Sequence, residues 1–219
     1  MRTLVLDIES DGLRLDAQVI QVACVATELD LDAGVLFREL GRWERKLTFD
    51  PKLAEAGALE INGWSEERWK DAVHPREACA RLAAFMEPHR DVECVSRKGK
   101  PYRVARLAGH NVDFDLDRLM PTFKSLGVFF PGHPRALCTK QLAMWADIVT
   151  GAPPPKSYSL VDLCAHYGIA REGEAHDALS DALAAAELAR RIVGPLAGKV
   201  RQRREVVFSV DSCKASTET

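Results

Sequence analysis

The 219-residue sequence lacks several features that would assign it to a well-marked class of protein. None of its six cysteines forms a C-x-x-C pair, and no cysteine–histidine run has the spacing of zinc ligands. A zinc finger is therefore excluded, and the apolar neighbours of most cysteines predict reduced core thiols. No apolar run approaches the roughly 20 residues that cross a bilayer, so we expect no membrane span.

An excess of positive charge is also missing, since the formal net charge is −2 and the sequence pI is about 6.3. Proteins that coat nucleic acid by bulk charge usually have a pI above about 9, which excludes that class. An enzyme that holds a few phosphates locally remains compatible with this net charge, because a cluster of active-site carboxylates would itself lower the pI. The first residues are too few and too acidic for a signal peptide, and we expect a cytoplasmic protein.

The composition that is present, 47% hydrophobic and 28% charged residues, is typical of a soluble globular protein. A single domain of this length buries roughly 70% of the surface of its unfolded chain, so it needs no disulfide or structural metal. We expect that domain over 1–198. The remaining residues, 199–219, are basic at first and then polar, which predicts a partly disordered tail with a short edge strand over 205–210.

Apolar, β-branched runs open the sequence, and apolar residues at helical spacing dominate later. Strands are expected over 3–9, 19–29, 34–49, 104–108 and 136–139. Helices are expected over 75–86, 114–126, 160–167 and 175–192, with another ending near 148. This order predicts an α/β fold: a mixed five-stranded sheet, an antiparallel meander followed by parallel strands, flanked by helices. The basic stretch 97–103 predicts an exposed loop or hairpin.

Two carboxylates, Asp7 and Glu9, end the first predicted strand. Because strand side chains alternate, both point to the same face, where they repel each other. A divalent cation between them would remove that conflict, since hard cations prefer carboxylate oxygens. Taken alone, the pair fits a metal site and a solvated strand end equally well.

Two predicted helices carry further carboxylates near their first turns. Asp115 lies on the inward face of the helix over 114–126, and Asp181 heads the apolar stripe of the helix over 175–192. His176 lies at the start of that last helix. Asp115 alone fits an interaction with the helix dipole, and His176 alone fits an ordinary surface position. Taken with the pair on the first strand, these residues indicate one metal-binding pocket, because unrelated surface features need not coincide in this way.

These motifs resemble those of the DEDDh exonucleases, a ribonuclease-H-like group that includes the proofreading subunit of polymerase III and RNase T. The resemblance covers residues 3–192, with softer matches at 58–63 and 158–163. Three motifs carry it: Asp7-Ile8-Glu9, His110-Asn111 with Phe114-Asp115, and His176 with Asp181-Ala182-Leu183-Ala184.

The resemblance implies a metal-dependent 3′→5′ exonuclease with two Mg²⁺ ions, for which Mn²⁺ can substitute. It implies that Asp7 bridges both ions, and that Glu9 and Asp181 complete the site of the attacking water. Asp115 would help to hold the second ion, and His176 would accept the proton of the water as general base. The products would be nucleoside 5′-monophosphates.

The same resemblance implies a set of contacts to the terminal nucleotide. They are Ser10, Asp11, Gly12, Leu13, Leu59, Ile61, Asn111 and Phe114. Phe114 also fits the position of an ordinary aromatic side chain in the core. The basic stretch 97–103 either contacts the phosphates of the nucleic-acid strand or is simply exposed to solvent. Many members of the family have Thr-Thr-Gly where this sequence has Ser10-Asp11-Gly12. Asp11 adds negative charge near the expected path of a substrate phosphate, which bears on substrate preference.

The expected substrate is single-stranded DNA or a frayed 3′ end. The alternative is a 3′→5′ exoribonuclease of the RNase T type, because the active-site motifs do not separate DNA from RNA. A non-catalytic nucleic-acid-binding subunit is a third hypothesis, which the presence of all five motif residues disfavours. A homodimer, or a subunit of a polymerase or repair complex acting in DNA replication or repair, is compatible with the resemblance.

Overall fold

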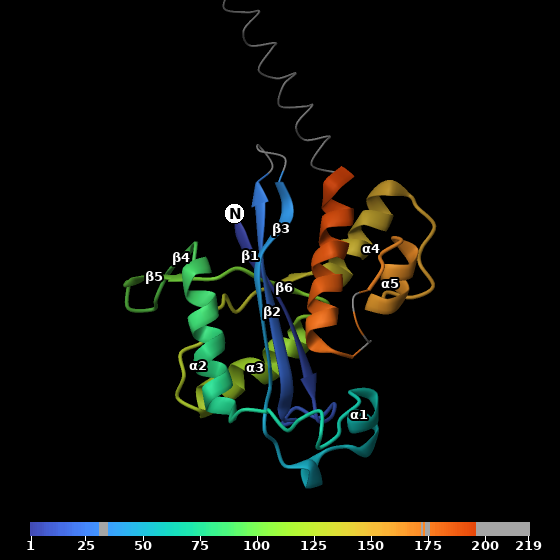
Figure 1. The fold of residues 1–219 in the computed structure, drawn as a ribbon. Coiled ribbons are helices and arrows are strands. Elements are labelled where there is room, and N and C mark those ends of the chain that lie inside the picture. Colours follow the sequence, from blue (N-terminus) through green and yellow to red (C-terminus); the bar gives the residue numbers. More distant parts are fainter. Residues whose placement is uncertain (31–34, 172, 174–175, 196–219) are drawn as a thin grey trace, which may run out of the picture.

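The strand that carries the first two carboxylates lies at the centre of a five-stranded sheet (Figure 1). The computed structural model describes residues 1–30, 35–171, 173 and 176–195. An antiparallel meander is formed by β1 (Arg2–Ser10), β2 (Val19–Asp30) and β3 (Val35–Lys46). Parallel strands are added beyond β1 by β6 (Leu107–Gly109) and β7 (Leu137–Cys138). The order β3-β2-β1-β6-β7 confirms the predicted mixed sheet.

Helices cover both faces of this sheet (Figure 1). One face packs against α2 (Pro75–Met86) and α3 (Asp113–Ser125). The other face packs against α4 (Thr139–Thr150), α5 (Leu160–His166) and a helix over 178–195. Side chains of β1 alternate between the two cores, since Leu4, Leu6 and Ile8 join the first and Val5 joins the second.

The basic stretch 97–103 belongs to a hairpin of β4 (Val92–Val95) and β5 (Pro101–Val104), as predicted. The hairpin lies beside the start of β1 (Figure 1), where the Arg2 N–H donates to Asp91 (2.9 Å). Asp7 and Glu9 lie toward the other end of that strand. The single strand predicted over 104–108 is wrong. Ala105 forms a parallel bridge to Gly132, so the chain changes partner there and β5 and β6 are separate strands.

The remaining elements are short. They are α1 (Ala56–Ile61), η1 (Pro51–Leu53) and η2 (Glu87–His89). The predicted helices are confirmed with shifted ends, and the last begins at residue 178 instead of 175 and continues to residue 195, where the described residues end. No helix in the described part of the chain is both long enough and apolar enough to cross a membrane. The predicted tail over 199–219, with its strand over 205–210, lies outside the described residues.

Candidate active site

Small side chains bring the 178–195 helix close to the acidic end of β1. Asp7 lies opposite Ala23 of β2, and Ala23 packs against Ala178 and Ala182 of the helix. Because alanines hold the helix backbone near the sheet, Asp181, between these positions on the helix, reaches the same end of β1 as Asp7.

Gln21 fixes the start of this helix. Its side chain is almost fully buried opposite Glu9, and its Nε2 donates to Asp177 Oδ1 (2.8 Å). The other oxygen of Asp177 accepts from the Ser180 N–H (3.1 Å), which caps the helix. His176 precedes this cap with a φ of +60°, a left-handed conformation of a kind that clusters at functional sites.

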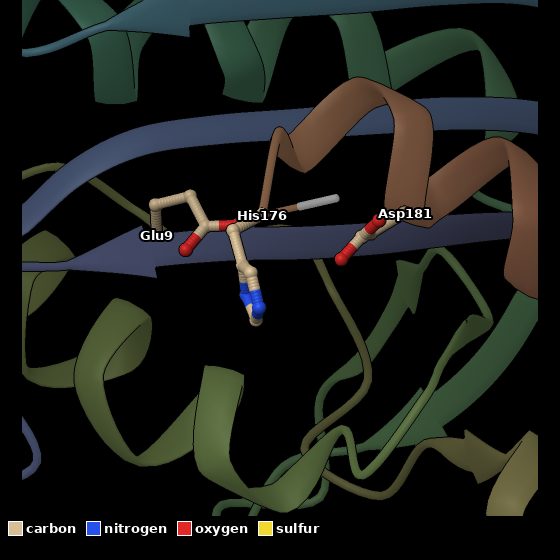
Figure 2. A group of neighbouring side chains, drawn as sticks. All are labelled: Glu9, His176 and Asp181. Atoms are coloured by element: carbon tan, nitrogen blue, oxygen red, sulfur yellow. The ribbon is translucent and has the colours of Figure 1, made fainter. Parts of the chain in front are cut away.

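Three side chains meet at this point. Ligand atoms of Glu9, His176 and Asp181 all lie within 4.8 Å of one another. Figure 2 shows the three side chains reaching the same space, Glu9 from β1, His176 from the segment before the helix and Asp181 from the helix itself. Carboxylates are ligands that hard divalent cations prefer, so Glu9 and Asp181 are candidate metal ligands, and the His176 ring lies beside them.

Asp115 reaches the same end of β1 from α3. Gly109 at the end of β6 allows the close passage, because a Cβ there would lie 2.7 Å from the Leu6 carbonyl oxygen. Asn111 then turns the chain with a φ of +59°, a conformation that asparagine tolerates better than most residues. Asp115 is buried two residues into α3, and its Oδ1 accepts from the Ile8 N–H of β1 (2.9 Å).

Crowding and burial raise the pKa values of all four carboxyls. Burial, reinforced by the charges of Asp115 and Glu9, raises the pKa of Asp7 well above its ordinary value. Burial, with the charge of Asp181 next, raises the pKa of Glu9 to about 8. Burial likewise raises the pKa of Asp115 to about 8, although the hydrogen bond from Ile8 opposes the rise. Burial also raises the pKa of Asp181. A divalent cation would offset this repulsion, so the donor set fits one.

The four acids and His176 line a cleft of about 640 Å³. Most of the predicted nucleotide contacts line the same cleft, namely Ser10, Gly12, Leu13, Ile61, Asn111 and Phe114. Leu59 and Asp11 are not among the lining residues. Leu59 is half-buried in α1, whose cleft-facing residues include Ala58 and Ile61.

Asp11 holds the turn after β1 together. Its carboxylate is fully buried and accepts from Arg14 Nη2 (3.0 Å to each oxygen). It also accepts from the backbone N–H and Nε2 of Gln18, at 2.8 and 2.6 Å. The negative charge expected on the substrate path is therefore paired inside the turn, away from the cleft.

Several cleft residues had no predicted role. Asn62 is buried, and its Nδ2 donates to the Ser10 carbonyl oxygen (2.9 Å), which joins the end of α1 to the turn. Glu55 Oε1 accepts from the Leu13 N–H (3.2 Å). The His110 ring lies between Thr139 Oγ1 (3.0 Å) and the Tyr158 carbonyl oxygen (3.1 Å). Asn62 lies in the softer match at 58–63, and His110 lies in the second motif, so the sequence pointed to both positions. No sequence pattern pointed to Glu55.

Phe114 is half-buried and is covered on one side by Arg118. The Arg118 guanidinium carbon lies 3.5 Å from the centre of the Phe114 ring. Arg118 Nη2 donates to the Leu13 carbonyl oxygen (2.7 Å), so one buried arginine joins α3 to the turn after β1. Phe114 is thus both packed against Arg118 and part of the cleft lining.

Three solved structures of similar fold are nucleases. Cell-death related nuclease 4 (CRN-4) matches with a TM-score of 0.67 and 14% identity over 88% of this chain and 63% of that chain. A 3′-exonuclease that recognises the 3′ end of the histone mRNA stem-loop matches with a TM-score of 0.65 and 10% identity, over 89% of this chain and 64% of that chain. The zinc-bound complex of E. coli exonuclease I with single-stranded DNA matches with a TM-score of 0.65 and 20% identity, over 94% of this chain and 42% of that chain.

No protein-family model matches the chain, and no curated protein matches it in sequence. The chain spans between 42% and 64% of the length of the three solved chains. At these identities the likeness is one of fold. The chain has the ribonuclease-H-like fold that its motifs predicted and that these nucleases share.

Proposed function

We propose that this chain is a metal-dependent 3′→5′ exonuclease that removes nucleotides one at a time from single-stranded DNA or a frayed 3′ end. One observation carries the proposal: four carboxylates and His176, from three separate segments, line a single cleft. The likeness of fold to solved nucleases supports it. The 3′ polarity rests on the resemblance of the three motifs to those of the DEDDh exonucleases.

Asp7, Glu9, Asp115 and Asp181 would hold two Mg²⁺ ions, for which Mn²⁺ can substitute. Bound ions of this kind stabilise the oxygens that enter and leave the phosphorus in an in-line displacement. The resemblance assigns the shared position to Asp7, and the charges of all three other acids raise the pKa of its carboxyl. Asp115 is held by its bond to β1, so its carboxylate is fixed before substrate arrives.

His176 would accept a proton from the attacking water. Its ring is exposed and lies beside Glu9 and Asp181, with ligand atoms within 4.8 Å. The water oxygen forms a bond to phosphorus, its proton passes to the imidazole, and the bond from phosphorus to the 3′ oxygen breaks. The 3′ oxygen takes a proton from solvent, which leaves a nucleoside 5′-monophosphate and a shortened strand.

The cleft volume of about 640 Å³ lies within the range of roughly 300–1,000 Å³ usual for small-ligand sites. Leu13 and Ile61 are largely exposed at the cleft, so a terminal base would bury apolar surface on them. Phe114 adds an aromatic ring on which a base can stack. Ser10 and Asn111 would contact the sugar and phosphate.

The decisive test uses 5′-labelled single-stranded DNA and RNA of one sequence with Mg²⁺, Mn²⁺ or EDTA. We expect a metal-dependent ladder that shortens from the 3′ end and is largely lost in His176→Ala. His166→Ala is the matched control, because His166 is also exposed but lines a different cavity. The His166→Ala variant should produce the same ladder as the wild type.

The same assay separates the alternatives. A faster ladder on RNA would indicate an exoribonuclease, an outcome that the structural likeness to a histone mRNA 3′-exonuclease makes worth testing. Intact DNA and RNA under every metal would support a non-catalytic binding subunit. Light scattering on the purified protein tests a homodimer, and co-purification tests a place in a polymerase or repair complex.

A further inference from the structure

Asp181 forms an ion pair with an arginine that belongs to none of the three motifs. Arg171 Nη2 contacts Asp181 Oδ1, and both side chains are only 14% exposed. The charge of Arg171 lowers the pKa of Asp181 and also that of Asp7, against the raising effect of burial. A largely buried guanidinium therefore lies directly against one member of the carboxylate cluster.

The local sequence directs Arg171 to this position. Gly168 follows α5 with a φ of +63°, and the Ile169 N–H donates to the Cys164 carbonyl oxygen (2.8 Å), which ends that helix. Ile169 is then buried in the same core cluster as Leu188 of the 178–195 helix. With Ile169 anchored against this helix, the side chain two residues later meets Asp181 on it.

Arg171 approaches from outside the cleft. It lines a separate cavity of about 370 Å³, together with Leu183 and Arg191, and it is not among the residues that line the cleft. Asp181 lines the cleft itself. Because a carboxylate has two oxygens with several lone pairs, the contact at Oδ1 leaves acceptor capacity for a cation on the cleft side.

We propose that Arg171 is a positioning residue, whose guanidinium holds the Asp181 carboxylate in the orientation in which it ligates a divalent cation. The inference rests on the proposed function, since it presupposes the metal site. Repulsion from Glu9 and Asp7 acts to turn Asp181 away from the cluster, and a fixed guanidinium behind it opposes that movement. Groups that hydrogen-bond to metal ligands commonly contribute to metal affinity in this way.

The test measures Mn²⁺ binding to the full chain by titration calorimetry at constant pH, without any nucleic acid. Arg171→Met should weaken binding by about 10- to 100-fold, the usual cost of losing such an outer partner. Arg171→Lys keeps the charge and should recover part of the affinity. Arg191→Met is the matched control, because Arg191 lines the same cavity but pairs with Glu187. The Mn²⁺ affinity of this variant should equal that of the wild type.

Unchanged affinity in Arg171→Met would overturn the inference. Tighter binding would overturn it as well, since it would mean that the guanidinium acts as a competing charge instead of an orienting group. Asp181→Asn separates this failure from failure of the proposed function: if Asp181→Asn binds Mn²⁺ normally, the metal site itself is wrong. Should Arg171→Met fail to fold by circular dichroism, Arg171→Lys carries the test, with measurably weaker binding expected.

Discussion

The backbone N–H of Ile8 donates a 2.9 Å hydrogen bond to Oδ1 of Asp115, although the two residues are 107 positions apart. The bond joins the first turn of α3 to the strand between Asp7 and Glu9. Asp115 therefore has two functions that can be separated: it supplies a charge to the cluster, and it accepts a buried backbone hydrogen bond.

Two substitutions at Asp115 should separate these functions. Asp115→Asn keeps an acceptor for the Ile8 N–H and removes the charge, so it should fold normally and lose most nuclease activity. Asp115→Ala loses both and leaves the Ile8 N–H without its partner, so it should be less stable than Asp115→Asn by about 1–3 kcal/mol. Urea unfolding and the DNA ladder assay measure the two effects. Equal stability of the two variants would show that the bond contributes nothing to folding.

The raised pKa values of Glu9 and Asp115 predict an unusual pH dependence of stability without metal. Between the ordinary carboxyl range near 4 and about 8, the unfolded chain has released protons that the folded protein retains. Because the folded state binds more protons in this window, the free energy of unfolding should fall as pH rises and level off above about 8. Saturating Mg²⁺ should weaken this slope, since the ion binds the ionised carboxylates.

Urea midpoints from about pH 5 to about pH 9, with Mg²⁺ and with EDTA, measure this linkage. Glu9→Gln is the internal control, because it removes one of the two groups and should reduce the slope in EDTA. A midpoint that rises with pH across the same window would contradict the prediction.

Asp11 is expected to matter for folding and not for substrate preference. Its buried carboxylate accepts from Arg14 and Gln18, so Asp11→Ala should lower the free energy of unfolding by about 1–3 kcal/mol. Nuclease assays with DNA and RNA, at a temperature where the variant is folded, should give the wild-type ratio of the two rates. A changed ratio would place the Asp11 charge on the substrate path after all.

The elements that carry the site could be predicted because their signals are local. Alternating and β-branched residues predicted β1 to β3, and the apolar spacing of 114–126 predicted α3 to within one residue at each end. Asp7 and Glu9 on one strand face followed from the two-residue repeat of a strand. These features depend on neighbours in sequence, and the sequence shows them.

Other features depend on contacts between distant side chains, and no local pattern carries them. The division of 104–108 into two strands follows from pairing of Ala105 with Gly132. The start of the last helix is set by Gln21, which lies 156 positions before Asp177. The pairing of Asp11 with Gln18 depends on how the turn folds back on itself. Arg171 and Asp181 are joined only because Ile169 is anchored in the core.

Arg118 should govern how tightly the cleft holds a nucleotide. It donates to the carbonyl oxygens of Phe114 (3.1 Å) and Leu13 (2.7 Å) and covers the Phe114 ring, so it fixes two proposed base contacts at once. Losing a charge-assisted hydrogen bond that orders this surface costs about 1.5 kcal/mol or more, which is roughly tenfold in affinity. Arg118→Met should therefore weaken binding of a short single-stranded oligonucleotide about tenfold.

Fluorescence anisotropy in EDTA measures this binding without cleavage, and steady-state kinetics with Mg²⁺ should show a raised KM with a smaller change in kcat. Arg118→Lys retains one donor and the charge, and should fall between Arg118→Met and the wild type. Phe114→Leu tests the ring alone, because it leaves the bond from Arg118 to Leu13 intact. If Arg118→Met lowered kcat at an unchanged KM, Arg118 would act on the reacting groups, and the role in nucleotide binding would be wrong.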